Sequence, residues 1–478
     1  MKRAMGELEM NEQTLPPSIL VGGTNGKGST SGMLWRLLAL SGVRCGLYTS
    51  PHVISFHERI QVSHRNLDLE FLETEIHILK TKLSADLYNE LTFFELTTLL
   101  ALYVFKKTEC QLMILEVGLG GRWDATNAVE PLASAIVSID FDHQEWLGTT
   151  LQAIAGEKLG IARANKPLFW GDLRRTELEE TLQAAHKQVG FDLYRANRDF
   201  AWDAEECKGV FQVPSFDSFS YALPNWLEDR AEILKSNFVL AFSIYYWVLH
   251  QRLLSNLAPN SKALSLRSLN SFGMTEPEIV IPKELRDLSL SSTSFNVWPY
   301  SFLGRMQRMR VQGKTKTWDF YLDVCHNIAS VRECVRTLQS AGVLNEESKK
   351  LTGFVSILRD KDLDAMIELL REILEPFVLF KIDNERSISE ERLAQQHNAF
   401  VLYENFETLW DHLADKVPSP IVVCGSFYAV GKVIDYFKAY PKTFSGQSML
   451  YALDPRDQHD HELTSSTISI PRQSRVEF

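Results

Sequence analysis

The stretch SILVGGTNGKGST, residues 18–30, joins a short apolar run to a glycine-rich turn. The apolar run predicts a buried strand, and the leucine-rich segment behind the turn predicts a helix near residues 28–41. A strand, a glycine turn and a helix in this order point backbone N–H groups and the positive end of the helix dipole toward an anion. The stretch therefore predicts a phosphate loop, in which Lys27 supplies a point charge and Ser29 or Thr30 supplies a hydroxyl.

The spacing within this loop differs from that of the commonest phosphate loop, GxxxxGK[ST]. Three residues rather than four separate Gly22 from Gly26, and Gly28 stands between Lys27 and Ser29. A glycine turn before a helix often serves packing alone. The complete run Asn-Gly-Lys-Gly-Ser favours a phosphate loop over that alternative.

From residue 18 to about 170, short β-branched runs alternate with longer segments of helical periodicity. This alternation predicts a mostly parallel sheet covered by helices. Thr92 and Glu95 fit a capping box at the start of a helix over residues 93–107. The predicted strands are SILVG, CGLYTS, LMILEVG and ASAIVSID, and further helices are predicted near residues 69–83 and 231–253.

A second α/β rhythm starts near Trp298 and has predicted strands at FYLDVC, LTGFVSI and PIVVCGS. Between residues 171 and 297 the order is looser, and residues 255–271 are typical of a surface connector. The length of 478 residues fits two domains and a smaller appendage. We therefore predict an α/β protein with three parts: an N-terminal phosphate-loop domain with a mostly parallel sheet at 1–297, a smaller Rossmann-like α/β domain at 298–440, and a flexible tail at 441–478.

Composition restricts the classes of partner. With 45% hydrophobic residues and a net charge of −11, the chain can build a large core but has no general basic field for nucleic acid or anionic lipid. The apolar stretches at 93–105 and 238–249 are shorter than the roughly 18 residues that a membrane span requires, so they predict buried helices. No apolar run follows the basic residues at the amino terminus, so we expect a cytoplasmic protein.

Six cysteines are scattered along the chain without a CxxC pair. Several adjoin apolar segments that predict strands. This pattern favours buried, reduced thiols over disulfides or a zinc site.

A nucleoside triphosphate is bound together with a divalent cation, so oxygen or imidazole ligands are expected at strand ends beside the loop. Glu116 closes the predicted strand LMILE, His143 follows AIVSI, and Ser50 ends GLYTS. Taken singly, each has an ordinary alternative: a solvated charge, a surface histidine and a turn serine. Their shared place after successive strands favours a metal site.

These residues belong to an ordered series of motifs by which the chain resembles the bacterial folylpolyglutamate synthase/dihydrofolate synthase family, relatives of the Mur ligases. The series covers residues 21 to about 435. It comprises GGTNGKGST, YTSPH with ERI, LTFFE, LEVGLGGRWDATN, DH through WLG, EKLGI, GR at 304–305, DVCHN, DKD and CGSF.

The resemblance implies an ATP-dependent amide ligase that joins L-glutamate to dihydropteroate or to reduced folate through an acyl phosphate. It also implies ATP and Mg²⁺ at two sites, with K⁺ as a further ion, small-molecule substrates and a monomer. The implied metal ligands are Ser50, Glu116 and His143. The implied nucleotide contacts are Thr24, Asn25, Gly26, Lys27, Gly28, Ser29, Asn237, Arg305 and Asp323. The implied catalytic residues are Lys27, His143, Lys158 and His326, and the implied pterin contacts are Thr92, Trp123, Asp124 and Ala125.

Two of these residues have competing interpretations. By the resemblance, Lys158 is carbamylated, which turns a cation into an oxygen ligand, whereas its sequence context alone predicts a charge on a helix surface. The Thr92 hydroxyl either contacts the pterin or caps its own helix.

The sequence departs from the family pattern in three places. The usual DAHNP reads DVCHNI, which would shift nucleotide or glutamate binding slightly. Trp123 replaces a smaller aliphatic residue and would reshape the pterin slot, and the segment before Val21 is shorter than the family's. A peptidoglycan Mur ligase, a nucleotide-binding module without turnover, and a phosphate-loop kinase or GTPase are the alternative functions.

Overall fold

The structure is a computed structural model. It describes residues 1–250 and 303–453, apart from gaps at 66, 173–174, 207, 214–217, 224–226, 228–231, 314–315, 345–349, 390–400 and 438–449. The predicted connector at 255–271 and the predicted boundary at 297/298 lie outside these residues, so the division into domains stays a prediction.

The N-terminal sheet has seven strands in the order β3-β2-β4-β1-β5-β6-β7. All neighbours are parallel except the edge pair β2 and β3. The strands are β1 (Ser18–Gly22), β2 (Cys45–Tyr48), β3 (Ile60–Val62), β4 (Leu112–Glu116), β5 (Pro131–Ile136), β6 (Pro167–Trp170) and β7 (Asp192–Arg195). Strand β1 coincides with the predicted strand SILVG and lies at the centre of the sheet, between β4 and β5.

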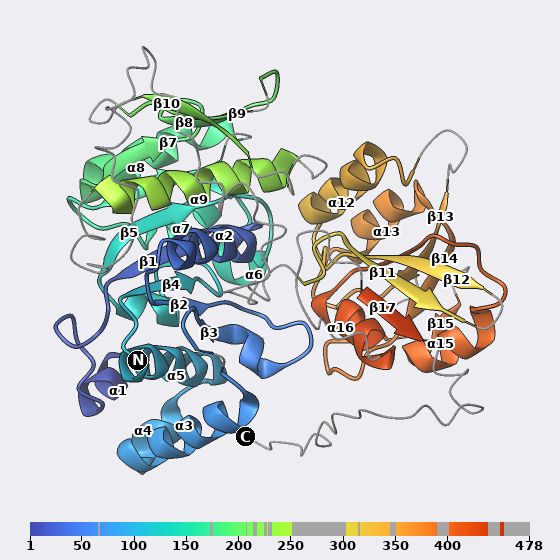
Figure 1. The fold of residues 1–478 in the computed structure, drawn as a ribbon, viewed down its shortest axis with the longest axis horizontal. Helices are drawn as coiled ribbons and strands as arrows, with labels where there is room; N and C mark the ends of the chain where they lie inside the picture. The colour runs from blue at the N-terminus through green and yellow to red at the C-terminus, as the bar shows by residue number, and fades with distance from the viewer. Residues whose placement is uncertain are drawn as a thin grey trace.

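Helices cover both faces of this sheet (Figure 1). Side chains of α5 (Phe93–Lys107) join the core on one face, and those of α2 (Lys27–Leu40) and α9 (Glu232–His250) pack on the other. Both apolar stretches that predicted buried helices are therefore confirmed as α5 and α9. The remaining helices of this part are α1 (Lys2–Glu7), α3 (Leu69–Lys82), α4 (Ala85–Glu90), α6 (Gln144–Leu147), α7 (Leu151–Leu159) and α8 (Glu179–Val189), with short 3₁₀ turns η1 (Phe56–Arg59), η2 (Ala125–Ala128) and η3 (Thr176–Leu178).

The looser order predicted from residue 171 onward is wrong for residues 179–222. Besides α8 and β7, this segment forms a three-stranded antiparallel sheet of β8 (Phe200–Asp203), β9 (Lys208–Phe211) and β10 (Phe219–Ala222). These strands have four residues each, and β8 is mostly half-buried. Such short strands carry too little apolar periodicity to be recognised in the sequence.

The second seven-stranded sheet has the order β15-β14-β13-β16-β12-β11-β17. Only β11 and β12 pair antiparallel among its described strands. The strands are β11 (Gln307–Gln312), β12 (Thr317–Leu322), β13 (Leu351–Val355), β14 (Leu374–Phe380), β15 (Leu402–Tyr403), β16 (Ile421–Cys424) and β17 (Leu450–Leu453). The helices are α12 (Ile328–Ser340), α13 (Leu363–Arg371), α15 (Phe406–Leu413) and α16 (Phe427–Tyr436). The predicted fold class, two mostly parallel α/β layers, is confirmed.

Strand β17 lies within residues 441–478, for which the sequence predicts a flexible tail. Its backbone pairs in parallel with β11 from Met309 to Gln312. The prediction of a tail is thus wrong for residues 450–453, because an edge strand obtains its hydrogen bonds from a distant partner rather than from a local sequence pattern.

Among the described residues, none of the helices combines the length and the apolar character needed to cross a bilayer.

Candidate active site

The glycine turn after β1 has the geometry of an anion cradle. Gly23 has φ +137° and Gly26, which caps α2, has φ +83°, both in the region that favours glycine. A Cβ atom on Gly26 would lie 2.8 Å from Nδ2 of Asn237, so the side chain of α9 and the loop can approach only because no Cβ intervenes. Helix α2 begins directly after this turn, so its first backbone N–H groups lie beside the loop.

Two lysine ammonium groups lie against this turn. Lys27 Nζ donates to the carbonyl oxygens of Gly23 at 3.1 Å and Thr24 at 3.0 Å. Lys158, from α7, donates to the Gly23 oxygen at 2.9 Å and is only 5% exposed. The prediction of a helix-surface charge for Lys158 is therefore wrong.

The Lys27 ammonium makes ionisation of Lys158 less favourable. Burial lowers the pKa of Lys27, whereas the carboxylates of Glu116 and Asp142 act in the opposite direction. Burial and the Lys27 charge together lower the pKa of Lys158 to about 7. At neutral pH, a substantial fraction of Lys158 therefore carries a neutral amine.

Glu116 and Ser50 meet at the carboxyl edge of the sheet. The Glu116 carboxylate is buried and accepts a hydrogen bond from the Ser50 backbone N–H at 3.0 Å. Burial raises the pKa of Glu116, and the Lys27 ammonium opposes that rise. Both residues line a small pocket with Gly28 and Arg305, so two of the three predicted metal ligands lie together beside the phosphate loop.

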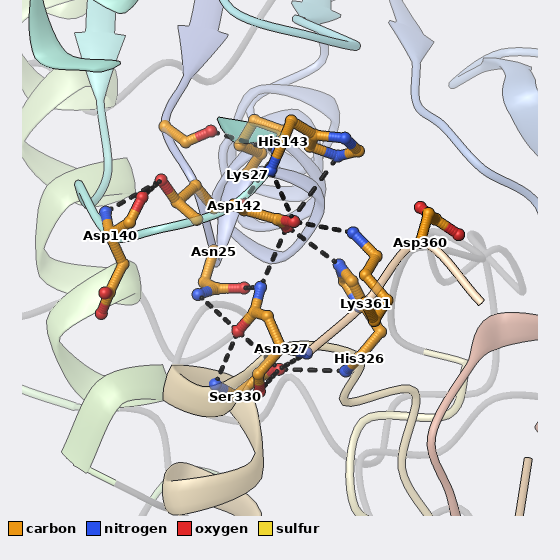
Figure 2. A network of polar contacts seen from close by, with 12 residues as sticks. Asn25, Lys27, Asp140, Asp142, His143, His326, Asn327, Ser330, Asp360 and Lys361 are labelled. Atoms are coloured by element: carbon orange, nitrogen blue, oxygen red, sulfur yellow. Dashed lines mark hydrogen bonds and ion pairs between the residues drawn. The ribbon is translucent and has the colours of Figure 1, made fainter. Parts of the chain in front are cut away.

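His143, the third predicted ligand, stands at the start of α6 with φ +51°. Burial lowers its pKa to about 4, so its imidazole is neutral and able to bind a metal ion at pH 7. Its Nε2 atom lies 3.9 Å from the Asp142 carboxylate. Figure 2 shows His143, Lys27 and Asp142 grouped on one side of the network.

Asp142 joins the two sheets, a role that the sequence analysis did not assign (Figure 2). Its carboxylate accepts from Lys361 Nζ at 2.7 Å and from Asn327 Nδ2 at 3.1 Å, and His326 Nε2 lies 3.7 Å away. Burial alone would raise the pKa of Asp142, but the nearby His326 imidazole and the Lys361 charge hold it well below its usual value. Asn25 of the phosphate loop adds a second link, because it exchanges amide hydrogen bonds of 3.1 and 3.3 Å with Asn327.

A cleft lies between the phosphate loop, α9 and the second sheet. It brings together six of the nine predicted nucleotide contacts: Asn25, Gly26, Ser29, Asn237, Arg305 and Asp323. Arg305 also lines the small pocket of Glu116, and its guanidinium carbon lies 5.2 Å from the Phe427 ring centroid. Arg305 therefore stands where the cleft and the small pocket meet.

The other predicted nucleotide contacts are placed differently. The Thr24 hydroxyl accepts from Asp140 N at 3.0 Å and donates to the Asp140 oxygen at 3.1 Å, so it ties the loop to the segment that follows β5. Gly28 and Lys27 stand at the start of α2, where Gly28 lines the small pocket.

The four predicted pterin contacts differ in their surroundings, and two of them form hydrogen bonds within their own segments. Thr92 caps α5, since its hydroxyl accepts from Glu95 N at 3.2 Å and donates to the Glu95 carboxylate at 2.9 Å. The Asp124 carboxylate holds its own loop through the N–H groups of Leu119 and Thr126, and Ala125 is buried. Trp123 is 87% exposed.

No protein-family model matches the chain. The chain is 27% identical over 421 residues to the dihydrofolate synthase/folylpolyglutamate synthase of Escherichia coli K12. This alignment covers 88% of this chain and 86% of that protein. It is 28% identical over 439 residues to the protein of the same name from Haemophilus influenzae, covering 87% and 88%. A solved structure of a bifunctional folylpolyglutamate synthase/dihydrofolate synthase with Mn, AMPPNP and L-glutamate bound matches with a TM-score of 0.68 and 26% identity, covering 91% of this chain and 92% of that one.

The fold and the site define an α/β phosphate-loop protein whose loop faces a second sheet across a cleft. The similarity to known proteins extends over both sheets and most of the chain. The chain is similar over most of its length to dihydrofolate synthase/folylpolyglutamate synthases, which confirms the resemblance that the ordered motifs indicated.

Proposed function

We propose that this protein is an ATP-dependent ligase that joins L-glutamate to dihydropteroate, to reduced folate, or to both, with release of ADP and phosphate. The observation that carries the proposal is the meeting of two pockets at Arg305. One is the cleft of the phosphate loop, and the other holds the Glu116 carboxylate and Ser50. Such a junction lets a terminal phosphate in one pocket meet an acceptor carboxylate in the other.

In this proposal the chain's own groups position and neutralise the triphosphate. The N–H groups of the phosphate loop and the start of α2 bind the phosphate oxygens, and Lys27 moves from its loop carbonyls to the transferred phosphate. Arg305, at the junction, stabilises charge that develops on the phosphate as the acceptor carboxylate attacks. Positioning and charge neutralisation supply most of the acceleration in phosphoryl transfer.

The donor set at the sheet edge fits Mg²⁺. The Glu116 carboxylate and the Ser50 hydroxyl are oxygen ligands, and the neutral His143 imidazole suits a second ion. Bound Mg²⁺ would supply charge neutralisation for the phosphates. Solved relatives crystallised with Mn and AMPPNP support this choice of cofactors.

The state of Lys158 supports its assignment as a carbamylated lysine. A carbamate forms when a neutral amine attacks CO₂, and the lowered pKa of about 7 supplies that amine. The product is an anion that attracts the neighbouring Lys27 ammonium, whereas an unmodified Lys158 ammonium repels it. Incubation with ¹³C-bicarbonate should give a carbamate carbon signal in NMR spectra of the wild type that Lys158→Met lacks.

The exposed aromatic side chains suggest where the flat pterin ring binds. Trp123 follows β4 and Trp146 lies in α6, and these side chains are 87% and 74% exposed. Their loops pack together, because a Cβ on Gly120 would lie 2.9 Å from Leu147. We assign this surface to the acceptor, and His326, beside Asp142, to the glutamate side of the second sheet.

We also propose that the enzyme acts as a cytoplasmic monomer on small molecules, with no nucleic acid or membrane partner and with domains at 1–297 and 298–440. The net charge of −11 supports the absence of polyanionic partners. Sedimentation with and without substrates tests the oligomeric state, and limited proteolysis tests the boundary.

The function is tested with ATP, Mg²⁺, labelled L-glutamate and either dihydropteroate or reduced folate. The expected product gains one glutamyl unit per ADP released. An ¹⁸O-labelled acceptor carboxylate should transfer one ¹⁸O to phosphate, which reports the acyl phosphate. Turnover with UDP-muramyl acceptors alone would identify a Mur ligase instead. Nucleotide binding without turnover on any acceptor would indicate a degenerate homologue.

A further inference from the structure

Three thiols that are distant in sequence meet beneath the second sheet's carboxyl edge. Cys325 follows β12, Cys334 lies in α12 and Cys424 ends β16, and none is more than 3% exposed. The thiols of Cys334 and Cys424 both lie within hydrogen-bonding reach of Cys325. The fold brings them together because β12 and β16 are paired neighbours and α12 begins just beyond β12.

Asp323 adds a carboxylate to this group. One ligand atom from each of Asp323, Cys325 and Cys334 lies within 4.8 Å of the other two. Two backbone N–H groups, of Met306 and Cys325, each donate to Asp323 at 2.9 Å and so fix its orientation. Each carboxylate oxygen keeps a further lone pair for a ligand.

The spacing is close to that of a tetrahedral metal site. Bond lengths of about 2.3 Å to sulfur and about 2.1 Å to oxygen place neighbouring ligand atoms roughly 3.5–3.8 Å apart. Small side-chain rotations would therefore bring the three atoms onto one ion. Two thiolates and one carboxylate suit a borderline or soft cation and not Mg²⁺, which prefers oxygen ligands.

The group is also reachable. Asp323 and Cys334 both line the cleft of the phosphate loop, so an ion can enter from that side. With three protein ligands, a fourth position remains for Cys424 or for a ligand from the cleft.

We propose that Asp323, Cys325 and Cys334, with Cys424 beside them, form a binding site for a soft divalent cation such as Zn²⁺. This site is separate from the Mg²⁺ site assigned to Ser50 and Glu116.

The test is a Cd²⁺ titration of the reduced, chelator-treated full-length protein in excess Mg²⁺, which occupies the oxygen sites. Absorption from thiolate-to-cadmium charge transfer should saturate at one equivalent. Cys325→Ala and Cys334→Ala should each weaken binding by more than a hundredfold, because losing a direct ligand costs more than the roughly 10–100-fold of an outer-shell partner. Cys110→Ala, which removes a buried thiol near the first sheet, is the matched control and should bind like the wild type.

Thermal unfolding checks that each variant is folded, and Cys325→Ser provides a second variant of nearly unchanged volume. Two results would overturn the site: no charge-transfer absorption in the reduced wild type, or equal Cd²⁺ affinity in the wild type and a folded Cys325 variant. Neither measurement involves ligase activity, so the outcome is independent of the proposed function.

Discussion

The two large sheets resemble each other in topology but use their carboxyl edges differently. At the edge of the first sheet, Lys158 and Glu116 are buried and Lys27 is half-buried, and backbone groups hold all three side chains. The second sheet instead sends Lys361 and Asn327 across to the first. The difference indicates that one sheet is built to carry out chemistry and the other to align with it through a few polar contacts.

The largest expected effect follows from removing the Lys27 charge at the carboxyl edge of the first sheet. Lys27→Ala should lower kcat by roughly a thousandfold, because transferred phosphate loses its nearest cation. The measurement is ADP release coupled to glutamate incorporation. Lys187→Ala, an exposed lysine of α8, is the matched control and should keep wild-type turnover. Equal rates for both variants would remove Lys27 from the mechanism.

Glu116→Gln keeps the shape of the same edge but removes a carboxylate. Since a bound metal ion contributes several kcal/mol, we expect kcat to fall by about a hundredfold and the Mg²⁺ concentration for half-maximal rate to rise. Glu130→Gln, an exposed carboxylate near the end of η2, is the control. An unchanged Mg²⁺ dependence in Glu116→Gln would contradict its role as a ligand.

The contact between the sheets is tested by Lys361→Met, Asp142→Asn and the double variant. Each single change should lower kcat by about tenfold to a hundredfold through misalignment of the two edges. The fold loss of kcat in the double variant should be smaller than the product of the two single losses, because the Lys361–Asp142 ion pair of 2.7 Å couples the two residues. Arg386→Ala, which breaks an exposed ion pair with Asp360 inside the second sheet's region, is the control. Additive losses would mean that the two residues act separately.

The sequence predicted the residues at the carboxyl edge of the first sheet far better than those at the edge of the second sheet. SILVG and the run behind it form β1 and α2 nearly as expected, since a continuous apolar strand and a glycine turn are local signals. Glu116 and Ser50 could be placed because parallel strands end at one edge. Asp142 with Lys361, and Cys325 with Cys334 and Cys424, could not be paired in advance. Their contacts depend on how two sheets and a helix pack, which no local periodicity encodes.

The buried Lys158 side chain should make the free energy of unfolding depend on pH. Its pKa of about 7 lies below that of an unfolded lysine, so the unfolded state binds more protons between about pH 7 and pH 10. The free energy of unfolding should therefore rise with pH across that window. Below about pH 7, the destabilisation caused by the buried Lys158 ammonium is fully present. Lys158→Met removes the penalty and should raise the free energy of unfolding by roughly 4 kcal/mol at pH 6, less as pH rises.

Unfolding by urea in bicarbonate-free buffer at a series of pH values measures this difference. Lys187→Met, on the exposed side of α8, should follow the wild type at every pH. If the stability of Lys158→Met runs parallel to that of the wild type from pH 6 to pH 10, the buried ammonium is not the source of the dependence.

The smallest expected effect concerns Trp123, which lies outside both buried edges. Trp123→Ala should raise KM for the pterin acceptor about fivefold to thirtyfold and leave KM for ATP unchanged, because stacking on one aromatic ring contributes on the order of 1–2 kcal/mol. Trp123→Phe should recover most of the affinity. Exposed Tyr428 of α16 offers a control, since Tyr428→Ala removes an aromatic ring from the second sheet's side. A KM for the acceptor that changes equally in the Tyr428 and Trp123 variants would argue that acceptor binding is not confined to the first sheet's loops.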